Sequence, residues 1–278
     1  SSHLGDASRT TVPIYLRGAM SNTRAVAWAL ALAAAWRAVT AVPVAVQDTS
    51  KRLTSLVQTA DGAPHHWPHV RGNVGSYGTT PLVGPVDLNA SFAWSFHHPD
   101  GRYHSVMLGG AVIDREKNIY VSTDSGIFKL SPQGHALWHY DKNVPYATVP
   151  SLMGDALYGS SSSGWYFALD LATGSELWNQ KLTTAVSGDT SYVEAHNGVV
   201  VAGARGAPEC GNWATIGINA TTGDKLWEYT ALDERVWNVM AVFPDDDTAI
   251  FMDLTGGVYR VGLHNGSEIW AARMNSSQ

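Results

Sequence analysis

The sequence predicts an all-β fold of the β-propeller class, and three observations support this prediction. Four segments share one pattern, in which glycine stands four residues before tryptophan and leucine or isoleucine stands directly before it. These tryptophans are 40, 49 and 43 residues apart, which is the period of a four-stranded propeller blade. The composition, with 27 Gly and 11 Trp, suits many short strands joined by tight turns. The four pairs are Gly134 with Trp138, Gly174 with Trp178, Gly223 with Trp227, and Gly266 with Trp270.

The part of the chain before residue 64 differs in composition from the repeats. Residues 1–24 form a basic, leader-like segment, and the Ala-rich apolar run at 25–46 predicts a helix of about 33 Å. This helix is a candidate membrane anchor, and the alternative is a helix that packs on the protein surface or core. A basic leader before such a run is typical both of an address to the thylakoid lumen and of a bacterial signal anchor. Residues 47–63 are polar and without periodicity, which indicates a linker.

Residues 64–278 are expected to form the propeller. A lone opening strand is predicted at 91–96, before the first repeat. The first repeat then predicts three strands and a fourth that ends near Trp138, and the same order recurs in the other three repeats. The three strands are expected at 111–113, 119–123 and 127–130. The sequence therefore predicts four four-stranded blades plus one opening strand.

The glycine and the tryptophan of each repeat have separate structural tasks. A tight turn before the outermost strand needs a residue that tolerates positive φ, and glycine does so without strain. An indole one strand later can lie flat against that bare backbone and reach the neighbouring blade. Because a blade cannot bury its faces alone, such aromatic contacts are expected to join successive blades.

The repeats resemble those of the pyrroloquinoline-quinone (PQQ) type propellers, which are known for a tryptophan-docking motif. Residues 168–178 fit the motif A-x-D-x-x-T-G-x-x-x-W at every fixed position, and 217–227 depart from it by Gly for Ala and Asn for Asp. The two outer copies keep chiefly the glycine and the tryptophan. Residues 67–78 also resemble the segment that often opens such propellers. The resemblance implies a propeller that is either a quinoprotein dehydrogenase or a cofactor-free scaffold, such as the outer-membrane barrel-assembly lipoprotein.

The number of repeats is smaller than the resemblance implies. Four repeats and an opening strand do not make the seven or eight blades usual for this family. The chain is part of a longer protein, or it forms an open arc that a partner closes, or it closes a four-blade ring by itself. Of these, an incomplete or open ring is the interpretation that we favour.

No catalytic, cofactor or metal residue of the quinoprotein enzymes can be carried over to this sequence. The resemblance implies that such an enzyme holds PQQ and a Ca²⁺ bound by Glu, Asn and Asp, with adjacent half-cystines over the quinone in alcohol-oxidising members. The chain has one cysteine, Cys210, so it cannot form that lid, and no acidic cluster stands at matching positions. PQQ and Ca²⁺ are thus expected only under the dehydrogenase alternative.

Histidines near the start of the propeller and three aspartates at 245–247 are candidate metal ligands. A metal site needs three or four converging side chains, but His65, His66 and His69 lie in a Pro-bounded stretch that does not form a regular helix. We therefore expect these histidines to pack in loops. The aspartates occupy a first-turn position of their repeat, which favours a solvated hairpin turn.

Residues 203–213 predict a long insertion between the second and third strands of the third blade. It contains Gly203, Glu209, Cys210 and Trp213. Long loops on a rigid scaffold commonly carry contacts, so this insertion is the candidate partner surface. The alternative is a loop that is merely variable in sequence.

Together these features predict a non-catalytic scaffold or accessory subunit rather than an enzyme. The expected partners are other protein subunits of a membrane-associated complex, a photosynthetic one among the variants, on the lumenal (thylakoid) or periplasmic side. The net charge of -6 and the lack of a basic stripe argue against nucleic acid. The alternative from another class is a PQQ-dependent alcohol or sugar dehydrogenase, or a fragment of one.

Overall fold

The computed structural model describes residues 64–80, 82–87, 89–101, 110–187, 192–237 and 241–273. All described residues belong to one compact unit, Ser50–Gln278. The basic leader, the Ala-rich helix and the linker predicted before residue 64 lie outside the described residues. Within the described part, no helix is long and apolar enough to cross a membrane.

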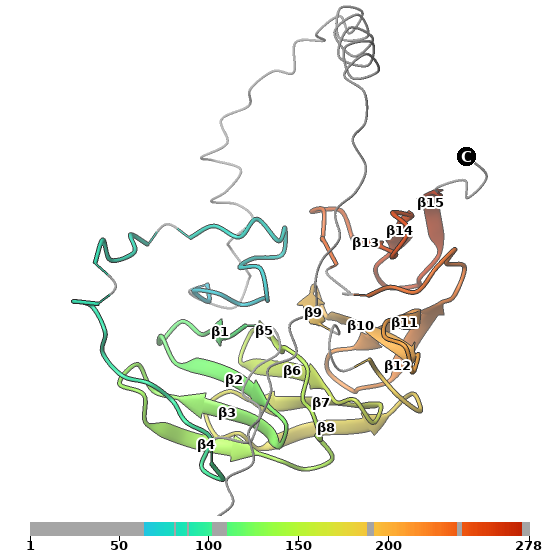
Figure 1. Cartoon of the computed structure of the whole chain (residues 1–278). Helices are drawn as coiled ribbons and strands as arrows, with labels where there is room; N and C mark the ends of the chain where they lie inside the picture. The colour runs from blue at the N-terminus through green and yellow to red at the C-terminus, as the bar shows by residue number, and fades with distance from the viewer. Residues whose placement is uncertain are drawn as a thin grey trace, which may run out of the picture. The chain divides into compact units, whose positions relative to one another are not determined.

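Fifteen strands in the described part form four antiparallel sheets, which we call the first to fourth blades (Figure 1). Each blade follows the chain as a simple meander, and the predicted all-β fold of propeller blades is confirmed. The four described blades do not close into a ring (Figure 1). The strands are, in the first blade, β1 (Val112–Ile113), β2 (Ile119–Thr123), β3 (Gly126–Leu130) and β4 (Ala136–Tyr140); in the second, β5 (Ser151–Met153), β6 (Ala156–Ser160), β7 (Trp165–Asp170) and β8 (Glu176–Lys181); in the third, β9 (Val193–His196), β10 (Val199–Gly206), β11 (Asn212–Asn219) and β12 (Lys225–Tyr229); in the fourth, β13 (Thr248–Met252), β14 (Val258–Gly262) and β15 (Glu268–Ala272).

The strands form where aromatic and β-branched residues alternate between the two faces of a blade. In β14 the burial alternates, so that Tyr259 and Val261 pack toward the third blade while Arg260 points to the other face. The register between the last two strands shifts at the same place in every blade, directly after the residue opposite the repeat tryptophan. The residues opposite the tryptophans are Lys129, Ala168, Gly217 and Arg260.

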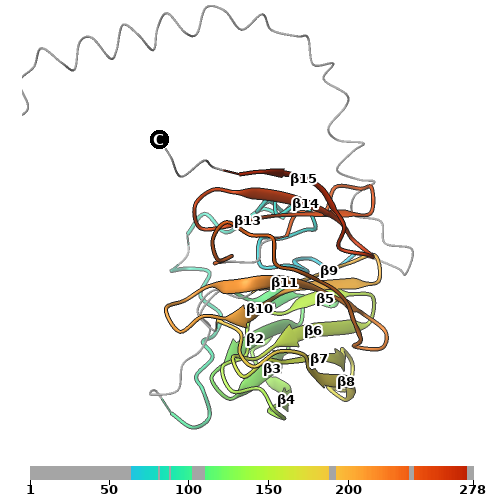
Figure 2. The same cartoon turned by 90° about the vertical axis from the view of Figure 1, so that its right-hand side faces the viewer.

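Most of the hydrophobic core lies between blades, and a smaller cluster lies between the first blade and the side chains of Trp94 and Phe96. One buried cluster joins Tyr166 and Trp178 of the second blade to Ile216 of the third. Similar clusters fill the space between the first and second blades and between the third and fourth. Figure 2 shows the blades in layers, with β13–β15 outermost. Each blade is therefore stabilised mainly by its neighbours.

Two predicted elements differ from the structure. The fourth blade has three strands, and its expected first strand is reduced to a single bridge between Val242 and Ile250. The opening strand predicted at 91–96 is not a strand, because these residues pair with no strand among those described. A strand exists only through its hydrogen-bonded partner, so an apolar pattern alone was insufficient here.

Candidate functional site

The repeat tryptophans are here called docking tryptophans, and three of them join two blades by lying on the glycine of the next repeat. The ring of Trp178 covers Gly223 so closely that a Cβ atom there would lie 2.7 Å from it. The Trp178 Nε1 donates a hydrogen bond to the Ala220 carbonyl at 2.8 Å, and the side chain is buried. Equivalent contacts join the first blade to the second and the third to the fourth: Trp138 with Gly174 and the Leu171 carbonyl, and Trp227 with Gly266 and the Leu263 carbonyl.

Glycine is required in these turns for two independent reasons. Gly223 has a φ of 78°, in the left-handed region that other residues rarely adopt. It also leaves room for the indole, as described above. The sequence associated a glycine with a tryptophan of the same repeat, whereas the structure places over each glycine the ring from the preceding repeat. The glycine and the tryptophan of one repeat therefore belong to two different junctions.

A fifth docking tryptophan, Trp94, was missed as such by the sequence analysis. Its ring lies on Gly134, where a Cβ atom would be 2.5 Å away, and its Nε1 donates to the Pro132 carbonyl at 3.0 Å. Trp94 stands 44 residues before Trp138, and this spacing within the repeat period was the available signal. At the other end of the array, Trp270 is 39% exposed, and no described glycine lies beneath its ring.

A second contact accompanies the indole at two of the three blade junctions. The tyrosine two residues after the docking tryptophan donates to the glutamate two residues after the next glycine. Tyr140 bonds Glu176 at 2.8 Å in this way, and Tyr229 bonds Glu268 at 2.5 Å. Burial opposes ionisation of Glu176, but its hydrogen bonds from Lys142 and Tyr140 outweigh this and lower its pKa. These pairs, which we call Tyr–Glu latches, reinforce the outer rim of the junctions.

The segment 67–78, here the opening segment, contacts the inner part of all four blades. Its backbone pairs with the first blade and accepts a hydrogen bond from the second blade. It accepts another hydrogen bond from the residues just before β13, and one of its side chains contacts the third blade. Contacts between such distant parts of the chain hold the array in one arrangement. They are Trp67 with Ile113, the Pro68 carbonyl with Leu152 N, His69 with Glu194, and the Val74 carbonyl with Phe243 N.

His69 and Glu194 form a fully buried pair at the centre of these contacts. The His69 Nδ1 lies 2.5 Å from the Glu194 Oε2, and both side chains are 1% exposed. The Oε1 atom of Glu194 has no hydrogen-bond partner. Burial raises the pKa of the Glu194 carboxyl, and the neighbouring His69 offsets part of this rise. His69, one of the candidate metal ligands, thus packs against β9 and serves the contact between opening segment and blade.

This pair makes the stability of the protein depend on pH with a defined sign. The raised pKa of Glu194 means that the folded state binds its proton more tightly than the unfolded state. Its contribution to stability is therefore fully present below the ordinary carboxyl pKa of 4.5 and is lost as the pH rises through the raised value. We expect Glu194→Gln to flatten the fall of the unfolding free energy as the pH rises above 4.5 in urea titrations. The control is Glu116→Gln in a surface turn, and an unchanged slope in Glu194→Gln would contradict the assignment.

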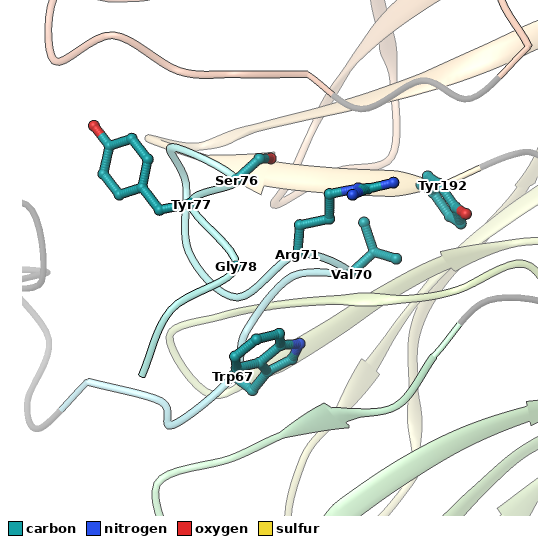
Figure 3. A pocket seen from close by; sticks show the side chains of 7 residues that line it. All are labelled: Trp67, Val70, Arg71, Ser76, Tyr77, Gly78 and Tyr192. Carbon is teal, nitrogen blue, oxygen red and sulfur yellow. The ribbon is translucent and has the colours of Figure 1, made fainter. Parts of the chain in front are cut away.

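A pocket of about 330 Å³ lies beside the opening segment, and Figure 3 shows its lining. The Arg71 guanidinium points toward Tyr192, and Trp67 lies below them, while Tyr77 points away (Figure 3). The lining residues are Trp67, Val70, Arg71, Ser76, Tyr77, Gly78 and Tyr192. None of them is a carboxylate, and among the described residues no group of three or more His, Cys, Asp or Glu could hold a metal ion. A Ca²⁺ ion needs six to eight oxygen ligands, so these residues do not fit a Ca²⁺–PQQ centre.

The insertion predicted at 203–213 is a long hairpin with a short tip. The strands β10 and β11 extend to Gly206 and from Asn212, so that only residues 207–211 form the turn. The tip is fixed in place: buried Asn212 exchanges two backbone hydrogen bonds with Val236, at 2.8 and 2.9 Å, and its side chain accepts one from Ser187 N at 3.0 Å. The expectation of a long loop was wrong because β10 continues through Gly203 and Gly206 and β11 already begins at Asn212.

The tip presents an aromatic surface to solvent. Trp213 is 46% exposed and Trp237 is 45% exposed. The Arg235 guanidinium lies 5.6 Å from the Trp213 ring centre and also pairs with Glu209 at 3.4 Å. Half-buried Cys210 has a φ of 100°, and its carbonyl accepts a bond from Arg235 at 2.9 Å. We call Trp213, Arg235 and Trp237 the tip patch, which is a rigid surface of the residue types found at contact hot spots.

Most of the residues singled out by sequence therefore occur in two places. The glycines and tryptophans of the repeats, apart from Trp270, lie at the junctions. The loop residues lie at or below the hairpin tip, where Gly203 packs against Asn212. Of the three aspartates, Asp246 pairs with Arg260 in the turn before β13. Arg235 and Trp237 were missed, because they belong to the next connection in the chain and only the fold brings them to the tip.

Solved structures with the same kind of fold include two quinoprotein enzymes. The quinohemoprotein alcohol dehydrogenase from Comamonas testosteroni is 15% identical with a TM-score of 0.58, and the match covers 82% of this chain and 43% of that one. A europium-containing methanol dehydrogenase is 14% identical with a TM-score of 0.58, and the match covers 81% of this chain and 51% of that one. BamB from Moraxella catarrhalis is 14% identical with a TM-score of 0.44, covering 61% of this chain and 52% of that chain. At such low sequence identity, the likeness to these structures shows the fold alone. The chain spans about half the length of these proteins.

A family model described as outer membrane protein assembly factor BamB matches residues 100–278, which is more than half of the chain. No curated protein matches the chain. The predicted resemblance to PQQ-type repeat propellers is confirmed by this match and by the solved structures. The chain therefore belongs to the family of the outer membrane protein assembly factor BamB.

Proposed function

We propose that this protein is a non-catalytic scaffold, an accessory subunit that holds other proteins in a membrane-associated assembly. The observation that carries the proposal is the tip patch, where Trp213 on the hairpin and Trp237 on the connection bonded to it are nearly half exposed. A rigid exposed tryptophan loses little conformational entropy on binding, which is why such residues dominate protein interfaces. The family description, an assembly factor for outer membrane proteins, supports the same role.

The proposal favours the periplasmic side of a membrane, because the family description refers to the outer membrane. The thylakoid lumen and a photosynthetic complex are the variants that the leader of the sequence also suggests. An anchoring role for residues 25–46 belongs to the same proposal. In each variant the blades form the rigid frame, and the hairpin tip forms the contact.

The second candidate function is a PQQ-dependent dehydrogenase, and the likeness of the fold to two such enzymes is the observation that favours it. A catalytic site of that kind needs carboxylates around a cation beside the quinone. The described residues do not offer this set, as the pocket lining and the buried pair His69–Glu194 show. The scaffold is therefore the better supported function.

The role of the tip patch can be tested by native purification from the source membranes with a tagged full-length chain. We expect Trp213→Ala to lose most of the co-purifying subunits, because the change removes the anchor and the partner of Arg235. Leu177→Ala, which changes a side chain on β8 that is 56% exposed, is expected to retain them. The circular dichroism spectrum should be the same for both variants.

Two outcomes would contradict the scaffold. One is a Trp213→Ala chain that keeps every partner of the wild type. The other is reduction of a dye by the wild-type chain when it is supplied with PQQ, Ca²⁺ and a primary alcohol.

A further inference from the structure

The opening segment inserts one side chain, that of His69, between the inner strands of the second and third blades. Its backbone turns back at this point, because His69 and Gly72 exchange two hydrogen bonds at 3.2 and 3.0 Å. Gly72 has a φ of 97°, which allows so tight a turn. The imidazole of His69 is thereby held among residues of β5 and β9, where it is 1% exposed.

Both strands place a polar group at the same ring nitrogen of His69. The Ser151 Oγ of β5 lies 3.3 Å from the His69 Nδ1, and it also accepts a hydrogen bond from Ala195 N at 2.8 Å. The Glu194 Oε2 of β9 lies 2.5 Å from the His69 Nδ1. Three parts of the chain that are distant in sequence therefore meet at one atom.

The carboxyl group of Glu194 lies on the side of β9 that faces away from the second blade. Val193 and Ala195 belong to the cluster between the second and third blades, so Glu194 and His196 point to the opposite side of the strand. There, cross-strand pairing places Val201 of β10 opposite Glu194. The carboxyl group thus has an apolar neighbour on one side and His69 on the other, and its Oε1 has no hydrogen-bond partner.

Few other ionisable groups surround this pair in the part of the chain that the structure describes. Ser151 and Val201, which β5 and β10 contribute, carry no charge. Of the ionisable neighbours, His69 is the one that acts on the pKa of Glu194. The other titratable or charged groups of the elements around the pair are Arg71 of the opening segment, Tyr192 just before β9, His196 at the end of β9, and Asp245 and Asp247 before β13.

The pair His69–Glu194 is electrically neutral only while it holds one proton. That proton lies on the His69 Nδ1 or on the Glu194 Oε2, and the 2.5 Å between these atoms leaves room for a single hydrogen. When the proton leaves, a carboxylate remains beside a neutral imidazole, and its charge is fully buried. An unpaired charge in such a place destabilises the contacts that keep water away from it.

We propose that this shared proton fastens the opening segment as a strap, and that the segment lifts from the inner ends of the blades when the proton leaves. Water then reaches the carboxylate of Glu194, so its charge is no longer buried. The blades stay joined, because the docking tryptophans hold the junctions through their own glycines and carbonyls. The pKa of Glu194, which burial raises, gives the direction: the strap is fastened at low pH and is released as the pH rises through the raised value.

The pocket beside the opening segment depends on the same strap. Six of its seven lining residues belong to the opening segment, and Tyr192 alone comes from the start of the third blade. Figure 3 shows the Arg71 guanidinium pointing across the pocket toward Tyr192. Lifting of the segment would separate these two walls. The pocket therefore exists only while the pair holds its proton.

Hydrogen–deuterium exchange of the full-length chain tests the strap, with rates corrected for the pH dependence of the chemical exchange. We expect the amides of residues 67–78 to exchange at least tenfold faster as the pH rises above 4.5, while those of β2 and β3 keep their rates. Glu194→Gln has no proton to lose at this position, so its opening segment should remain protected at every pH. Glu116→Gln, in an exposed turn, is the control and should behave as the wild type.

His69→Gln gives a second test, which also decides if near-ultraviolet circular dichroism shows that Glu194→Gln does not fold. Because His69 offsets part of the rise in the pKa of Glu194, its removal raises that pKa further. The release of the opening segment should therefore move to higher pH in this variant. A shift to lower pH would contradict the role of the shared proton.

Three other results would overturn the proposal. If the corrected exchange of residues 67–78 does not change with pH, the opening segment is not released. If the opening segment and the strands of the blades gain exchange together, the pH acts on global stability and not on the strap. If a well-folded Glu194→Gln chain keeps the pH dependence of the wild type, another group controls the release.

Discussion

Trp178→Ala is expected to lower the free energy of unfolding by about 3–5 kcal/mol, which is the cost of removing a fully buried indole. The Trp178 ring belongs to the cluster between the second and third blades, lies on Gly223, and donates to the Ala220 carbonyl. Its loss leaves a cavity and an unsatisfied carbonyl at the same place. Urea titration followed by far-ultraviolet circular dichroism measures the change.

Trp270→Ala is the matched control, since it removes the same side chain from the same position of a repeat. Because Trp270 is 39% exposed and has no receiving glycine among the described residues, we expect a loss of about 1 kcal/mol or less. If the two variants lost equal stability, the indoles would not act through the junctions.

Gly223→Ala is expected to cost about 2–5 kcal/mol. An alanine at a φ of 78° is strained by about 1–2 kcal/mol. Its Cβ would in addition lie 2.7 Å from the Trp178 ring, and displacing a packed ring typically costs about 1–3 kcal/mol more. The same titration measures the sum of the two effects.

Gly198→Ala separates the two effects. Gly198 has a φ of 77°, nearly that of Gly223, but a Cβ atom there would meet nothing within 4 Å beyond its chain neighbours. This variant should therefore show the backbone strain alone, and the difference of about 1–3 kcal/mol belongs to the indole. Equal losses for the two glycines would mean that the ring moves aside freely.

The sequence was sufficient to predict the blades because their signals are local. A turn glycine, an apolar strand and a tryptophan at fixed spacing lie within about ten residues, so no long-range contact was needed to recognise them. Trp94 was not recognised as a docking tryptophan because Ala90 stands where the motif has glycine and Ala93 where it has leucine or isoleucine. Its glycine is in the next repeat, and only the structure joins the two.

The candidate site depended more on contacts that are distant in sequence. Trp213 was found from its own neighbourhood, but Arg235 reaches it from the connection after β12. The hairpin was taken for a loop because Gly203, Gly206 and Gly211 weaken the strand pattern. The pair His69–Glu194 joins residues that are 125 positions apart, and no local pattern could have indicated it.

The opening segment has a consequence for how the protein unfolds. In most repeat arrays each unit contacts only its nearest neighbours, so the end units can fray one after another. Here one short stretch touches the inner part of all four blades, from Ile113 to Phe243. If one end blade unfolded, the opening segment would also lose contacts that hold the other blades. Thermal unfolding should therefore approach a single cooperative transition. During synthesis the same stretch leaves the ribosome before all four blades and finds its last contact only after the first three blades and Phe243 have been made.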